Sequence, residues 1–169
     1  MHGIELVQRM RTEFNFEPVI RTAVKTGEVR DRAEAEELLE AFLQWFSLLP
    51  EVIAGRTYVM LKGPVDCIFH SLILNTRLYE AFCLEFIGQF IHHEPLDDGT
   101  ESALESAVLY TVDLLEHNFG AALHPRLQEW RGQLKNGAWV VSCPPKNCGH
   151  NTMGQTVLGR MENGAAVVH

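Results

Sequence analysis

The strongest helix signal in the chain lies at residues 31–46, which read DRAEAEELLEAFLQWF. Asp31 followed three residues later by Glu34 is typical of a capping box, and residues 33–45 are rich in strong helix formers. The apolar residues of this stretch recur at helical spacing and form one stripe: Leu38, Leu39, Phe42, Trp45 and Phe46. Pro50 closes the segment. The pattern therefore predicts an amphipathic helix with an aromatic-rich apolar face.

The segments on either side of this helix show similar spacing and similar start and stop signals. Further helices are expected over residues 4–14, 18–25, 64–74, 77–91, 101–117 and 125–134. In the range 77–91, Leu78, Phe82, Phe86 and Phe90 recur at intervals of four, so they share one helical face. His92, His93 and Glu94 precede Pro95 and should end that helix, because a residue before proline resists the helical conformation.

Two short apolar segments, Thr57–Leu61 and Ala138–Val141, are candidates for strands. From residue 142 to residue 169, Gly, Asn, Pro and polar residues dominate, which favours an irregular and partly mobile tail. We therefore predict an all-α, or mostly α, single-domain bundle of about six helices over residues 1–141, with at most a minor strand pair. The segment 142–169, which contains Cys, Gly and Asn, is expected to form an irregular C-terminal tail.

The composition narrows the class of protein. The chain has 169 residues, of which 46% are hydrophobic and 21% charged, as in ordinary globular domains. It has 14 Lys and Arg against 22 Asp and Glu, and a net charge of -8 repels phosphate backbones, so no nucleic-acid partner is expected. No apolar run is long enough to span a bilayer, and the first residues do not resemble a secretory signal. We expect a cytoplasmic protein without membrane contact, whose partner is another protein or a second copy.

The densest polar cluster in an apolar setting contains Asp66, His70, His92 and His93. Asp66 and His70 are four residues apart, so on a helix they share a face. If the helices over 64–74 and 77–91 form an antiparallel hairpin, one of the two later histidines returns beside Asp66 and His70. Two histidines and a carboxylate are a known ligand set for zinc or non-haem iron. The cluster predicts a divalent-metal site.

A second candidate metal or thiol site lies near the C-terminus, where Cys143, Cys148 and His150 fall within eight residues. Thiolates with an imidazole favour zinc, but a closed structural site needs a fourth ligand. Free thiols or a disulfide are the alternatives. In a reducing compartment the disulfide ranks last, so we expect free or metal-bound thiols in reduced protein.

These patterns leave two functions open. In the first, the protein binds a metal through Asp66, His70 and one of the later histidines, as a small metalloenzyme in which metal-bound water reacts. In the second, it is a non-catalytic interaction module in which His70 is satisfied by Asp66 and the cluster locks two helices. Cys83 could act as a nucleophile with His70 as its base, but its apolar neighbours favour a buried, inert thiol.

The stretches Val65–Cys83 and Gly88–Pro95 resemble the central motif of the glycine-rich-domain-containing protein-like family. The matching positions are Asp66, Phe69, His70, Leu74, Thr76, Tyr79, Cys83, Gly88, His92 and His93. The resemblance implies that the Asp-His-His cluster acts as a unit, with Tyr79 and Cys83 in supporting roles.

The chain departs from this family in several places. Phe69 stands where many relatives have Trp, and Leu72 stands where some have a second His. The glycine-rich and RNA-binding modules of the larger plant relatives are absent, so their connection to RNA does not transfer. The family supplies no activity that can be carried over to this chain.

Overall fold

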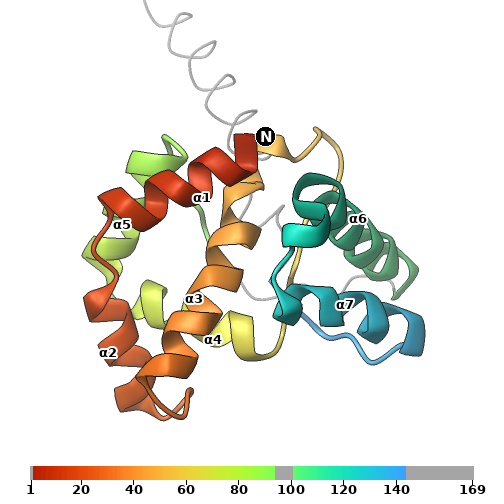
Figure 1. Ribbon diagram of the computed structural model, residues 1–169. Coiled ribbons are helices and arrows are strands. Elements are labelled where there is room, and N and C mark those ends of the chain that lie inside the picture. Colours follow the sequence, from red (N-terminus) through yellow and green to blue (C-terminus); the bar gives the residue numbers. More distant parts are fainter. Residues whose placement is uncertain (1, 94–100, 144–169) are drawn as a thin grey trace, which may run out of the picture.

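The computed structural model describes residues 2–93 and 101–143, and these residues fold mainly into helices (Figure 1). The α-helices are α1 (His2–Glu13), α2 (Glu17–Thr26), α3 (Arg32–Ser47), α4 (Pro64–Leu74), α5 (Thr76–Phe86), α6 (Glu101–Phe119) and α7 (Pro125–Asn136). Two 3-10 turns, η1 (Leu49–Glu51) and η2 (Gly120–Ala122), and two strands, β1 (Met60–Leu61) and β2 (Val141–Cys143), complete the described part. The predicted mostly α fold with a minor strand pair is confirmed. No helix within the described ranges is long and apolar enough to cross a membrane.

Helix α3 begins where the capping box predicts and runs through the middle of the molecule (Figure 1). The Asp31 side chain accepts a hydrogen bond of 2.9 Å from the amide of Glu34. The Glu34 carboxylate reaches back to the amide of Arg30, one residue before the cap, at 2.7 Å. Helices α1, α2, α4 and α7 all contact α3. Its stripe therefore faces several helices at once, which explains why nearly every apolar residue in its second half is buried.

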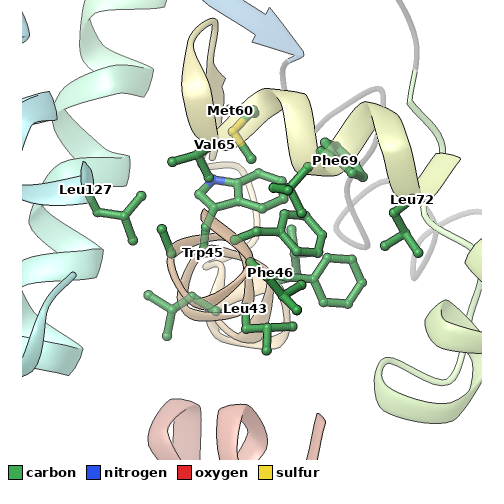
Figure 2. Close-up of a cluster of buried hydrophobic side chains, with 14 of the residues drawn as sticks. Leu43, Trp45, Phe46, Met60, Val65, Phe69, Leu72 and Leu127 are labelled. Atoms are coloured by element: carbon green, nitrogen blue, oxygen red, sulfur yellow. The ribbon is translucent and has the colours of Figure 1, made fainter. Parts of the chain in front are cut away.

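The core forms where α3 meets α4, as Figure 2 shows. Leu43, Trp45 and Phe46 come from α3, and Val65, Phe69 and Leu72 come from α4. Met60 and Leu127 approach the same cluster from β1 and α7. All eight side chains are buried. Burying a large apolar side chain contributes roughly 1.5–3 kcal/mol, so this cluster fixes the orientation of α4 on α3.

Buried hydrogen bonds fix the chain between η1 and α4. The Trp45 indole donates to the Val59 carbonyl and the Tyr58 hydroxyl donates to the Trp45 carbonyl, each at 2.9 Å. The Val59 amide donates to the Thr111 hydroxyl on α6 at 2.8 Å. The two rings of Trp45 and Tyr58 also stack, with centroids 5.3 Å apart. These contacts place β1, and therefore the start of α4, against both α3 and α6.

Strands β1 and β2 pair antiparallel with an irregular register. Met60 pairs with Cys143 and Leu61 with Val141, and the amide of Lys62 donates to the carbonyl of Val140 at 2.7 Å. The strand predicted at Ala138–Val141 is displaced, because α7 ends only at Asn136 and the chain reaches β1 later than expected. β2 also crosses residue 142, where the irregular tail was predicted to begin. Residues 144–169 of that tail lie outside the described residues.

The predicted helix over residues 77–91 is wrong at its end. Helix α5 ends at Phe86, and Gly88 adopts the left-handed conformation with φ 82°. The amides of Ile87 and Gly88 both return to the carbonyl of Cys83, which closes the last turn. Phe90 still packs inward, against Tyr79 with ring centroids 5.2 Å apart, but from a non-helical segment. The fourfold spacing of apolar residues therefore continued past the end of the helix.

Candidate functional site

Asp66 and His70 lie one turn apart on α4, as their spacing predicts. Pro64 occupies the first turn, where its missing N–H costs nothing, and Asp66 follows in the same turn. Nε2 of His70 lies 3.6 Å from Oδ2 of Asp66. The Asp66 side chain is only 4% exposed, whereas that of His70 is 40% exposed. The pair therefore links a buried carboxylate to an imidazole that reaches the surface.

The carboxyl group of Asp66 is poorly satisfied for a buried group. Its Oδ1 atom is buried and has no hydrogen-bond partner within the described part of the chain. Burial raises the pKa of Asp66 above its usual value, and the hydroxyl of Ser142 on β2 is the main influence that opposes the rise. The charge of His70 also opposes it, whereas Glu28 reinforces it. Such a carboxyl gains stability from a proton or from a cation.

His93 reaches the Asp66–His70 pair from the segment after α5. The Tyr79 hydroxyl donates a 2.5 Å hydrogen bond to the carbonyl of the fully buried Ile91, which fixes this segment beside α5. The ring of His93 then packs edge-on against Phe69 at 4.9 Å and against His70 at 5.4 Å between centroids. Burial, and then the charge of His70, lower the pKa of His93. The lowered pKa favours the neutral imidazole of His93, which is the form that binds metals.

His92 points elsewhere. It is exposed and packs against the ring of Phe90, with centroids 5.1 Å apart, on the wall of a cavity. Of the four residues of the predicted cluster, the structure brings three together, namely Asp66, His70 and His93. The return of a histidine to this pair was predicted through a longer helix, but it occurs through a non-helical segment.

The three residues are neighbours without forming a closed ligand set. Among residues 2–93 and 101–143, no group of three or more His, Cys, Asp or Glu side chains is arranged to hold a metal ion. A change of side-chain rotamer would be needed before Asp66, His70 and His93 could share one ion.

The two supporting residues, Tyr79 and Cys83, lie on the buried side of α5. Burial raises the pKa of the Cys83 thiol to about 11, although the Ile91 backbone and Tyr79 oppose the rise. The thiolate is therefore scarce at neutral pH, which agrees with an inert thiol rather than a nucleophile. Burial likewise raises the pKa of Tyr79, whose hydroxyl is already engaged with Ile91.

The second candidate site is only partly described. Cys143 is buried at the end of β2 and takes part in a disulfide, whereas Cys67 and Cys83 are free thiols. Cys148 and His150 lie outside the described residues. The prediction of free or metal-bound thiols assumed a reducing compartment, where a disulfide is the least favoured arrangement.

Sequence reasoning missed the residues that surround the cluster. Ser142 approaches Asp66 from β2, and Glu28 accepts a long 3.5 Å hydrogen bond from Ser71 on α4. The cavity beside His92 and His93 was missed as well, together with Arg77 at its edge. These residues come from distant elements or are of types that are common on protein surfaces. Neither spacing nor composition could therefore identify them.

Comparisons with known proteins give one family. The UCP032817-like family model matches residues 7–106, which is more than half of the chain. The matched range contains α3, α4, α5 and the cluster formed by Asp66, His70 and His93. No curated protein and no solved structure matches the chain. The chain belongs to the UCP032817-like family.

Proposed function

We propose that this protein binds a divalent cation, zinc or iron, through Asp66, His70 and His93. The observation that carries the proposal is the buried Asp66 carboxyl, whose Oδ1 has no hydrogen-bond partner among the described residues while Oδ2 faces the His70 imidazole. A bound cation would satisfy that oxygen and offset the cost of burying the charge. The lowered pKa of His93 keeps a second imidazole neutral beside the first.

The donor types suit the proposed ions. Imidazole nitrogen and carboxylate oxygen bind zinc and iron, and two histidines with one carboxylate leave coordination positions open. When bound, such an ion supplies Lewis acidity to a water molecule or a carbonyl oxygen. The half-exposed His70 gives the site access to solvent. The most specific version of this proposal is therefore a metalloenzyme in which the bound ion takes part in a reaction.

Untagged protein treated with a chelator and then titrated with zinc, iron(II) or manganese tests the proposal. We expect one equivalent of zinc or iron to bind and to raise the melting temperature. Asp66→Asn, His70→Ala and His93→Ala should each remove that rise. His117→Ala is the matched control, because His117 is exposed near the end of α6. Wild-type protein whose melting temperature none of these ions changes would contradict the proposal.

A second candidate function has its own support. The His93 ring is packed between Phe69 and His70, and the described residues hold no ready-made three-ligand group. On this alternative the cluster is a structural network that holds the segment after α5 on α4, in a non-catalytic interaction module. It predicts that His70→Ala lowers the melting temperature of chelator-treated protein. It also predicts that purified wild-type protein contains no bound metal.

The setting of the protein is part of the same proposal. We place it in the cytoplasm, with a protein or a second copy as partner, and we retain the resemblance to the glycine-rich-domain-containing family as a hypothesis. The excess of acidic residues argues against nucleic acid. An oxidising compartment is the alternative location, because a disulfide such as that of Cys143 persists there. Thiol counts on protein extracted under acid quench distinguish the two, because a cytoplasmic protein should show Cys143 reduced.

A further inference from the structure

A cavity of about 340 Å³ opens beside the proposed metal site, between the end of α4, the first turns of α5 and the segment 90–93. Its lining consists of Ile73, Thr76, Arg77, Tyr79, Glu80, Phe90, His92 and His93. The volume falls in the range of small-molecule sites. A small organic ligand matches this volume.

The cavity has an apolar wall. The rings of Tyr79 and Phe90 meet edge to face at 5.2 Å, and His92 packs on Phe90 at 5.1 Å. The Tyr79 hydroxyl is occupied by the Ile91 carbonyl, so Tyr79 contributes mainly its ring. An aromatic or branched hydrocarbon group would find stacking and dispersion contacts here.

Arg77 brings a positive charge to the lining of the cavity. Six arginines form ion pairs with Asp or Glu: Arg9, Arg11, Arg30, Arg32, Arg126 and Arg131. Arg77 forms none with the described residues, even though acidic residues outnumber basic ones in the chain. An exposed guanidinium that forms no ion pair with the described residues is available for an external carboxylate.

The backbone at the same place also favours an anion. Arg77 lies in the first turn of α5, where the helix dipole is positive and a cationic side chain is unfavourable. The side chain of Asn75 makes no capping hydrogen bond with this helix, and its Nδ2 donates instead to the hydroxyl of Thr22 and to the carbonyl of Ser71. The first amides of α5 and the guanidinium of Arg77 therefore both attract a negative charge.

We propose that this cavity binds a small organic monocarboxylate with an aromatic or branched apolar body. The carboxylate pairs with Arg77 and with the uncapped start of α5 at Thr76, and the apolar body lies against Tyr79 and Phe90. Glu80, one turn further along α5, restricts the ligand to one negative charge, because a second carboxylate would meet its charge.

This inference goes beyond the proposed cation site. Arg77, Thr76 and Phe90 are not proposed metal ligands, and only His93 belongs to both sites. The two proposals can therefore fail separately. Carboxylate binding that persists in Asp66→Asn protein with chelator present would support the cavity whatever the outcome of the metal titration.

The test is titration of wild-type protein with benzoate at constant ionic strength, with chelator, followed by calorimetry and by NMR shifts. We expect binding that Arg77→Gln weakens at least about tenfold, because a charge-assisted pair is lost. Glu80→Gln should instead strengthen binding by about twofold to fivefold, since it removes a repelling charge. Arg21→Gln is the matched control, because Arg21 is an exposed arginine on α2 outside the cavity lining.

Three further results would overturn the inference. Benzyl alcohol, which has the same ring without the charge, should bind at least about tenfold more weakly than benzoate, and equal binding would remove the role of Arg77. Absence of benzoate binding at millimolar concentration to the wild type, or equal effects of Arg77→Gln and Arg21→Gln, would reject the site. The substituted side chains are exposed, so equal melting temperatures should show that all variants fold.

Discussion

The Asp66 carboxyl links the stability of the protein to pH. Its pKa in the folded protein is raised above 3.8, so the folded state holds its proton more tightly than the unfolded state does. Above about pH 4 the unfolded state loses the proton first, and the free energy of unfolding therefore falls as pH rises through the folded-state pKa. This contribution has the opposite sign to that of an ion-paired carboxylate.

Asp66→Asn should remove this dependence. The neutral amide no longer carries a buried charge, so metal-free Asp66→Asn protein is expected to be more stable than wild type at pH 7, by roughly 1 kcal/mol. The same variant should lose any stabilisation by zinc or iron. Urea unfolding at pH 5 and pH 7 measures both effects. Asp113→Asn, on an exposed side chain, serves as the charge-matched control. A less stable Asp66→Asn protein would show that the carboxylate is better solvated than its burial indicates.

His93 should give the protein a second pH dependence. Burial lowers its folded-state pKa below 6.5, so the unfolded state binds the proton more readily. Its contribution to stability is complete above pH 6.5 and is lost as pH falls toward the folded-state pKa. In chelator-treated His93→Gln protein the stability should change less between pH 7 and pH 5 than in wild type. Chemical denaturation across that range checks this, and an unchanged slope would assign the effect to other groups.

At the scale of elements, the Tyr79 hydroxyl anchors the segment after α5 through a buried hydrogen bond. Tyr79→Phe removes the donor to the Ile91 carbonyl and leaves that buried oxygen without its partner. We expect a loss of about 1–2 kcal/mol in the free energy of unfolding. Because His93 follows Ile91, metal affinity should also fall although no proposed ligand is changed. Phe90→Leu, which keeps the donor, is the control for packing, and its metal affinity should stay close to wild type.

The elements show where sequence reasoning succeeded. The capping box at Asp31 and Glu34 placed the start of α3 correctly, because the cap is a local interaction between neighbouring residues. The end of α5 was misplaced, because Phe90 satisfies the same apolar spacing from a non-helical segment. The break is set by the left-handed Gly88, and glycine by itself gives only a weak stop signal inside an apolar pattern.

In the candidate site, too, the sequence predicted the local geometry and not the contacts between distant elements. The i, i+4 spacing gave the Asp66–His70 pair, since that geometry follows from the helix alone. It could not say which of His92 and His93 returns to the pair, because the choice depends on Tyr79 and on the path after Gly88. Neighbours contributed by distant elements, such as Ser142 and Glu28, require the tertiary fold.

At the scale of the whole molecule, the docking of α1 depends on a small residue. A methyl group added at Gly3 would lie 2.8 Å from Cδ2 of Leu48, which is fully buried next to the end of α3. Gly3→Ala should therefore destabilise the protein by about 1–3 kcal/mol through overpacking.

Gly132→Ala provides the matched control for that substitution. Gly132 lies within α7, and nothing lies within 4 Å of an added methyl group. Alanine there should stabilise the protein by roughly 0.5–1 kcal/mol, because it favours the helix. Thermal unfolding of the two variants should thus show shifts of opposite sign. A Gly3→Ala protein that is as stable as wild type, or more stable, would mean that α1 does not pack closely on Leu48.

The pairing of Met60 with Cys143 also bears on the order of folding. Four α-helices of the described chain separate the two strands, so joining them closes a long loop, and chain entropy delays such a contact. Contacts between neighbouring helices close far shorter loops and can form first. The β1–β2 ladder would then be absent at the rate-limiting barrier, and weakening it would accelerate unfolding while the refolding rate stays almost unchanged. Ser142 approaches Asp66 only through β2, so the polar surroundings of the buried carboxyl would be completed in the last step.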